Sequence, residues 1–158
     1  MQSIHLISPT PLVLYGLNQL FQDNQKFQVQ NKFHSLPAFQ DAFESVKFKG
    51  TLILDYFTEL YESKKQDYFW QQWKSLDILL IHSETNPIKI RRLFKSGIQG
   101  YLLPNSPPDE ILKGVEHISD GQTYVSPKLQ QSFWEGTPVG GKFRKPNACK
   151  LTKREKQV

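Results

Sequence analysis

Short apolar runs alternate with longer stretches of helical periodicity along the first 136 residues. The short runs predict five buried strands. Between them, apolar positions recur at the three- and four-residue spacing of amphipathic helices, so these stretches predict helices. The second strand alternates apolar and polar residues, as is typical near the edge of a sheet. The predicted strands lie at Ile4–Ser8, Phe27–Phe33, Thr51–Asp55, Asp77–His82 and Gly100–Leu103.

The predicted helices fill the intervals between these strands. A third, less regular helical region at 57–74 is rich in aromatic residues and includes Trp73. The other apolar faces that define helices are Leu12, Val13, Leu17, Leu20 and Phe21; Phe39, Phe43 and Val46; and Ile111, Leu112, Val115 and Ile118.

Capping residues predict where two of the helices begin. Asn86 is a suitable cap for a helix that starts at Pro87 and that Gly97 ends. Ser106, with Asp109 three residues later, resembles a capping box at the start of the fifth helix.

Five strand–helix units in strict alternation predict an α/β protein with a parallel sheet covered by helices on both faces. Connections between parallel strands are right-handed in nearly all proteins, which favours a doubly wound sheet.

Charge divides the chain into a nearly neutral body and a basic tail. The 158 residues carry a net charge of +5. Residues 137–158 hold seven cations and one acid, a net of +6, so residues 1–136 carry −1. This distribution excludes a protein that coats nucleic acid with its whole surface. The Gly- and Pro-containing segment Gly136–Cys149 indicates a linker, and Pro127–Trp134 could add a small helix.

Cysteine count and hydropathy narrow the class of protein further. Cys149 is the single cysteine, which excludes an internal disulfide and a zinc site built on cysteine pairs. The apolar runs are too short to span a bilayer, and the N-terminus carries no signal-peptide pattern. We expect a soluble, cytoplasmic protein without a membrane partner.

The last eight residues open a helix that the sequence does not complete. Thr152 and Glu155 form the T-x-x-E signature of a helix start. The chain stops at Val158, well short of the ~12 residues that an isolated helix needs for marginal stability. This pattern indicates a fragment of a longer protein.

Ligands of open parallel sheets bind at the carboxyl ends of the strands. The loop after the first strand, Ser8-Pro9-Thr10-Pro11, has no glycine, and its two prolines offer no N–H to a phosphate. This disfavours both a dinucleotide site and a flavin enzyme, so we expect no cofactor. The other residues at this edge are Asp55, Tyr56, His82, Ser83, Pro104 and Asn105.

Asp55 has two interpretations at this edge. It could cap the following helix or turn, where aspartate is favoured. It could instead accept a phosphoryl group, which requires a metal, a cation and a hydroxyl donor beside it. His82 is a candidate donor or a structural residue.

Several segments resemble the receiver domain of two-component response regulators. They are the five alternating units, Leu54-Asp55, and the GIQGYLL sequence of Gly97–Leu103. Three further segments are similar to the LuxR-type branch: TPLV with GL at 10–17, GQTYVSP at 121–127 and LTKREKQV at 151–158.

The resemblance implies a flavodoxin-like receiver fold with strand order 2-1-3-4-5. It also implies a linker and a helix-turn-helix, which L-T-x-R-E opens. The implied domains are a receiver at 1–122, a short helical extension at 123–136, a basic linker at 137–150 and a truncated helix-turn-helix at 151–158.

The resemblance further assigns positions in a phosphorylation pocket. Receivers hold an acidic pair after the first strand, an acceptor Asp after the third, Thr or Ser after the fourth and Lys after the fifth. We therefore expect a degenerate pocket without a metal, which keeps only the phosphoacceptor equivalent. The matching positions here are Ser8 and Pro9, Asp55, His82 (or Ser83 after a one-residue slip) and Pro104.

Two functions are consistent with this resemblance. The first is a non-enzymatic pseudo-receiver of a transcription factor, which works without phosphorylation and controls a DNA-binding domain beyond Val158. The second is a receiver that accepts a phosphoryl group at Asp55. A histidine kinase or another regulatory protein is an implied partner of either.

The resemblance also implies a homodimer, and the sequence offers two surfaces for it. One pairs the first and fifth predicted helices. The other pairs cations of the fourth helix with acids of the fifth, namely Lys89, Arg91, Arg92 and Lys95 with Asp109, Glu110 and Glu116.

Overall fold

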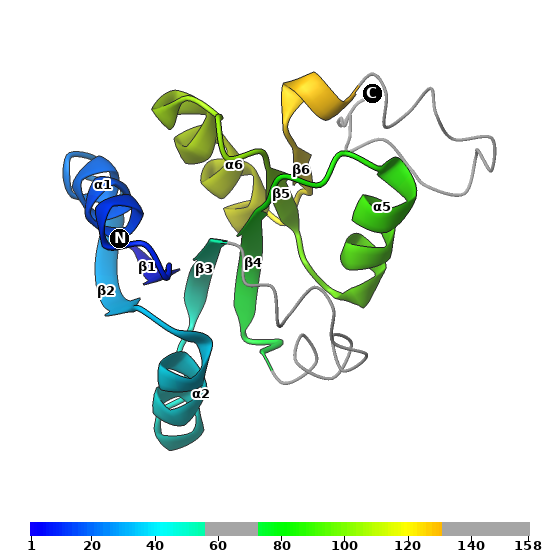
Figure 1. The fold of residues 1–158 in the computed structure, drawn as a ribbon. Coiled ribbons are helices and arrows are strands. Elements are labelled where there is room, and N and C mark those ends of the chain that lie inside the picture. The colour runs from blue at the N-terminus through cyan, green and yellow to red at the C-terminus, as the bar shows by residue number, and fades with distance from the viewer. Residues whose placement is uncertain (56–72, 131–158) are drawn as a thin grey trace.

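Six parallel strands form one sheet with helices on both sides (Figure 1). The computed structural model describes residues 1–55 and 73–130. In chain order the elements are β1 (Gln2–Ile7), α1 (Pro11–Gln22), β2 (Phe27–Phe33), α2 (Leu36–Ser45), β3 (Gly50–Asp55), β4 (Leu76–Ile81), α5 (Pro87–Ser96), β5 (Gly100–Leu102), α6 (Pro108–Ser119) and β6 (Tyr124–Val125).

The strand order is β2-β1-β3-β4-β5-β6, and every neighbouring pair is parallel. This confirms the doubly wound architecture and the order 2-1-3-4-5 of the first five strands. The prediction of five strands was wrong by one, because β6 pairs with β5 through Gly100–Tyr124 and Tyr101–Val125. A two-residue strand is too short to show a periodicity in the sequence.

The burial of each strand follows from its place in the sheet. Within β3 the four residues of 51–54 are all buried, and in β4 every residue except Asp77 is buried. Continuous burial is expected where helices cover both faces. In β2, Phe27 is buried and exposed residues alternate with partly buried ones, which confirms the predicted edge strand.

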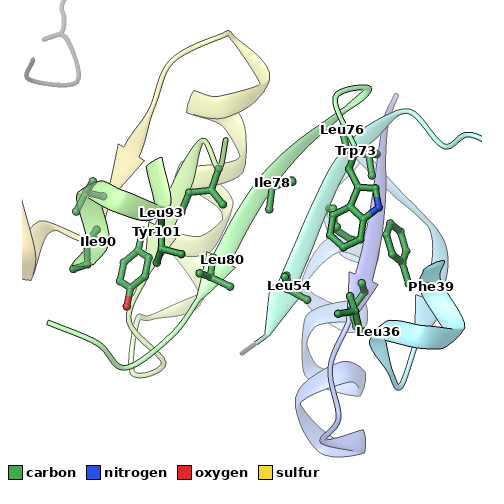
Figure 2. Close-up of a cluster of buried hydrophobic side chains, with 14 of the residues drawn as sticks. Leu36, Phe39, Leu54, Trp73, Leu76, Ile78, Leu80, Ile90, Leu93 and Tyr101 are labelled. Carbon is green, nitrogen blue, oxygen red and sulfur yellow. The ribbon is translucent and has the colours of Figure 1, made fainter. Parts of the chain in front are cut away.

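Two apolar cores lie on opposite faces of the sheet. The first joins α2 and α5 to the strands, and Figure 2 shows Trp73, Phe39 and Tyr101 within it. The rings of Phe39 and Trp73 meet edge to face with centroids 4.8 Å apart. The second core lies beneath α1 and α6 and includes Leu14, Leu17, Phe21, Val115 and Ile118.

The predicted ends of α5 are confirmed. Asn86 Oδ1 accepts a hydrogen bond of 2.9 Å from the backbone N–H of Ile88. Gly97 follows the last turn with a φ of 129°, a conformation that favours glycine.

Three sequence expectations were wrong in detail. Ser106 does not cap α6, because Pro107 is the cap residue and the Ser106 hydroxyl donates to Leu103 O instead. Val46 follows α2 in extended backbone and is 61% exposed. Trp73 lies in a turn before β4, although it is almost fully buried. The Ser106 hydroxyl is taken up by a local turn, whereas Trp73 is buried by contacts with residues distant in the sequence, such as Phe39.

Several predictions fall outside the described residues. They concern the helical region up to residue 72, the rest of the extension to 136, the linker and the helix-turn-helix start. Residues 127–130 are helical, as expected for the beginning of the extension. None of the helices described is long and apolar enough to cross a membrane.

Candidate functional site at the carboxyl edge of the sheet

The parallel strands bring the predicted site residues to one edge of the sheet. Ile7 pairs with Leu54, and Asp55 pairs with Ile81 in β4. Ser8, Asp55 and His82 therefore follow one another across the ends of β1, β3 and β4. Pro104 lies two residues beyond β5, at the same edge.

Ser8 and Asp55 are in direct contact. The fully buried Ser8 hydroxyl donates to Asp55 Oδ2 at 2.8 Å and accepts from the backbone N–H of Thr10 at 3.1 Å. The Thr10 carbonyl oxygen is more distant, at 3.3 Å. A hydroxyl has one proton, and a carboxylate is the stronger acceptor. The first-strand position is thus filled by a neutral donor bound to the Asp55 carboxylate.

The other predicted pocket residues add no charge to this edge. Pro9, Ser83 and Pro104 are exposed. The proline side chains offer neither a ligand atom nor a cation. In the part of the chain that the structure describes, no three His, Cys, Asp or Glu side chains gather into a group that could hold a metal.

His82 is buried and accepts a backbone hydrogen bond. Its Nδ1 receives the N–H of Glu84 at 3.0 Å and lies 3.2 Å from the Tyr101 hydroxyl. That hydroxyl donates to Glu84 O at 2.8 Å. Nδ1 is therefore unprotonated, and the neutral ring carries its proton on Nε2. Burial lowers the pKa of His82, and the nearby Glu84 carboxylate opposes this shift.

The loop after β4 is fixed by residues that sequence reasoning did not single out. Tyr101 and His82 hold the two backbone groups of Glu84. The Glu84 carboxylate accepts from the N–H groups of Thr85 and Asn86 and pairs with Lys89 at 3.3 Å. One available signal was the single tyrosine in the apolar GYLL segment, because a buried phenol requires a polar partner. The loop therefore has a defined conformation beside the site.

A second buried histidine, His5 in β1, contacts β2 and the segment that precedes β3. His5 Nε2 donates to Lys49 O at 2.8 Å, and the Asn31 amide donates to its Nδ1 at 3.0 Å. The ring stacks on Phe48 with centroids 5.0 Å apart. Burial lowers the pKa of His5, and the hydrogen bond to Lys49 O opposes this shift. Protonation of His5 requires the Asn31 amide to turn its oxygen toward Nδ1.

We expect the free energy of unfolding to decrease as the pH falls below about 6.5. The folded-state pKa values of His5 and His82 lie below the ordinary histidine value of 6.5, so the unfolded chain takes up protons first. Each histidine adds a slope of at most about 1.4 kcal/mol per pH unit between its unfolded and folded pKa values. Urea denaturation at pH 7.5, 6.5 and 5.5 measures this slope.

The matched variants for that experiment are H5Q and H34Q. H5Q removes one buried histidine and should reduce the slope. H34Q replaces an exposed histidine and controls for the substitution itself. Burial raises the pKa of Asp77, so its contribution has the opposite sign and increases the free energy of unfolding as the pH falls. A slope that is unaltered in H5Q would contradict the assignment.

The comparisons with known proteins point to regulators. No family model matches the chain. The transcriptional regulatory protein DesR of Bacillus subtilis is 27% identical over 81 residues, which cover 51% of this chain and 35% of DesR. The oxygen regulatory protein NreC of Staphylococcus epidermidis is 42% identical over 41 residues, 26% of this chain and 19% of NreC. The matches thus span about a third and a fifth of these relatives.

Solved structures of RcsB, two of them from Salmonella, show the same fold. The isolated receiver domain has a TM-score of 0.70 at 17% identity and covers 82% of this chain and 96% of that one. A longer RcsB chain has a TM-score of 0.75 at 18% sequence identity, and the match covers 98% of this chain and 74% of that one. RcsB in its DNA complex has a TM-score of 0.71 at 15% sequence identity, and the match covers 99% of this chain and 73% of that one. In its fold the chain matches the receiver domain of RcsB, and parts of its sequence are similar to the regulators DesR and NreC.

Proposed function

We propose that this receiver domain is the regulatory part of a transcription factor and works without phosphorylation of Asp55. In this proposal, DNA is bound by a C-terminal domain that follows the described residues. The RcsB–DNA complex and the name of DesR support the assignment to transcription. A histidine kinase is not required for this mechanism, so control comes from protein level, a protein partner or a small ligand at the strand edge.

The observation that carries this proposal is the Ser8–Asp55 hydrogen bond. A phosphorylation site needs acidic ligands that hold Mg²⁺ against the acceptor carboxylate. At the end of β1 the chain instead places a hydroxyl that donates to Asp55 Oδ2 at 2.8 Å. The hydroxyl is a neutral donor at the position where a metal-binding carboxylate is needed. Asp55 is then a structural acceptor that holds the ends of β1 and β3 together.

We further propose that the domain forms a homodimer through α1. The twelve residues of this helix, PLVLYGLNQLFQ, include no charged side chain. Leu12 and Tyr15 are 78% and 64% exposed, and the neighbouring Gly16 is also exposed. In a two-fold interface the same patch meets its own copy, so a charged residue near the axis meets a like charge. An uncharged apolar helix suits this arrangement.

The charged surface on α5 fits a dimer less well. Of its four cations, Arg91 is 91% buried, and its Nε approaches Pro87 O at 3.4 Å. Lys89 is paired with Glu84. On α6, Glu116 is paired with Lys26 at 2.7 Å. Much of the predicted charge complementarity is therefore satisfied within one molecule.

Light scattering tests both the proposed dimer through α1 and its independence from phosphorylation. We expect a concentration-dependent dimer whose dissociation constant is unaffected by acetyl phosphate and Mg²⁺. L12E should weaken this dimer about 100-fold or more, since two buried carboxylates would face each other across the axis. V46E is the matched control, because Val46 is similarly exposed but lies at the end of α2.

Two outcomes would contradict it. A monomer that dimerises only with acetyl phosphate would show control by phosphorylation. Dissociation by I88E but not by L12E would place the interface on α5, where Ile88 is 59% exposed.

A further inference from the structure

Two serine hydroxyls bind the two backbone groups of one residue, Leu103, at the carboxyl edge of the sheet. The backbone N–H of Leu103 donates to Ser126 Oγ at 3.0 Å. The Ser106 hydroxyl donates to the carbonyl oxygen of Leu103 at 2.7 Å. The two hydroxyl oxygens lie 3.4 Å apart. We call this arrangement the hydroxyl ring of Leu103, Ser106 and Ser126.

Proton counting fixes the direction of each bond in the hydroxyl ring. The single proton of Ser106 goes to Leu103 O, so this hydroxyl can only accept in its contact with Ser126. Ser126 therefore donates to Ser106 and accepts from Leu103. The hydroxyl ring is closed, and both backbone groups of Leu103 are satisfied by side chains.

The hydroxyl ring joins two parts of the chain that have different roles. Leu103 and Ser106 lie in the β5–α6 loop, on either side of Pro104, at the candidate site. Ser126 follows β6 and is 1% exposed. Its backbone carbonyl accepts from the N–H groups of Leu129 and Gln130, at 2.8 and 3.2 Å. Ser126 thus immediately precedes the helical turn at 127–130, and its carbonyl oxygen accepts the first hydrogen bonds of that turn.

Other hydrogen bonds connect this turn to β5. The backbone N–H of Ser126 binds Tyr101 O at 3.0 Å, and β6 pairs with β5 over only two residues. The Gln130 side chain donates to Val125 O at 2.9 Å, within the same short segment. These bonds tie the turn to β5, whereas the hydroxyl ring ties it to the β5–α6 loop.

We infer that the hydroxyl ring couples the β5–α6 loop to the turn at 127–130, so that a binding event which displaces the loop also releases the turn. A buried hydroxyl bonded on both sides has few alternative positions, because each lost bond leaves a buried polar group unsatisfied. The loop and the turn therefore move as one unit or lose the hydroxyl ring together.

That this coupling carries a regulatory signal rests on the proposed function. The coupling itself requires neither DNA nor phosphate, so it is tested on the 158-residue chain alone. Failure of the dimer or phosphorylation experiments would overturn the proposed function and leave the coupling intact. Conversely, failure of the hydrogen-exchange experiment would overturn the coupling and leave the proposed function intact.

Amide hydrogen exchange of three variants tests the coupling. S126A should accelerate exchange at Leu103, Leu129 and Gln130 about tenfold or more, because the hydroxyl ring is lost. The decisive variant is S106A, whose side chain contacts neither Leu129 nor Gln130. Coupling predicts faster exchange at both of these amides as well. Amides of β1 and β3 are the internal reference for global stability.

S119A is the matched control. The Ser119 hydroxyl donates to Val115 O at 2.6 Å within α6, outside the hydroxyl ring. S119A should leave Leu129 and Gln130 unchanged. If S106A accelerates exchange only within 103–106, or if all amides accelerate equally in S126A, the coupling does not exist.

Discussion

Incubation with acetyl phosphate and Mg²⁺ is expected to give no phosphate adduct on this chain. Mg²⁺ requires near-octahedral oxygen ligation, usually from carboxylates together with water and phosphate oxygens. Ser8 offers Asp55 a hydrogen bond in place of such a carboxylate. Phosphoryl transfer also needs a cation against the equatorial oxygens, and Pro104 supplies none.

The size of the expected effect follows from these losses. Removal of one oriented electrostatic contact costs about 3 kcal/mol, or roughly a hundredfold in rate. Loss of the metal lowers the rate of phosphoryl transfer further, although the total is seldom the simple sum of the separate free-energy costs. Intact-mass measurement after an hour should therefore show unmodified protein alone.

One control variant is expected to gain a phosphate adduct, and another removes the acceptor residue. The triple variant S8D/P9D/P104K restores the acidic pair and the cation, and we expect it to gain an adduct in the presence of Mg²⁺. P104K alone changes an exposed residue and verifies that the loop tolerates lysine. A stoichiometric adduct on the unaltered chain that disappears in D55A would overturn the interpretation of this pocket and favour a phosphoryl-accepting receiver.

Replacement of Gly50 by alanine is expected to cost at least about 3 kcal/mol of unfolding free energy. Gly50 opens β3 with a φ of 115°, a backbone conformation that L-residues rarely adopt. A Cβ at this position would overlap the carbonyl oxygen of Ser3 in the neighbouring strand. Backbone atoms of a central strand cannot move aside without disturbing the β1–β3 pairing, so both penalties apply together. Urea denaturation measures the loss.

The control for that experiment is G16A in α1. Gly16 lies in the interior of the helix, and a Cβ there would meet no described atom within 4 Å other than its chain neighbours and the helix's own backbone. We expect G16A to stabilise the chain by about 0.5–1 kcal/mol, because alanine loses less backbone entropy on helix formation. Equal effects of G50A and G16A would show that the special conformation of Gly50 has no energetic role.

The sequence was sufficient to predict the strands whose burial is continuous. Thr51–Asp55 and Asp77–His82 stood out because central strands of a parallel sheet are apolar throughout. Asn86 and Gly97 marked the ends of α5 because capping is a local interaction. Trp73 and β6 were misassigned or missed because a turn packed into a core, or a two-residue strand, leaves no periodic signal.

The candidate site was predicted in position but not in its bonding. Because the strands are parallel, Asp55 and Ser8 could be assigned to the same edge from the sequence. Their hydrogen bond depends on the register of β1 with β3, which the sequence does not encode as a pattern. The contacts of Tyr101 and His82 were also missed, since their shared partner is the backbone of Glu84.

The strand order also sets the order in which this domain can assemble. β1 is the first strand of the chain, yet it lies between β2 and β3, and its end meets a residue 47 positions away. Such non-local parallel pairing makes folding slow, because loop-closure entropy is lost before the contacts form. β6, the last strand of the described residues, pairs with β5 over two residues only. During synthesis, the exposed edge of β5 therefore remains unprotected until Tyr124 and Val125 have left the ribosome, and association through that edge is the characteristic hazard of this topology.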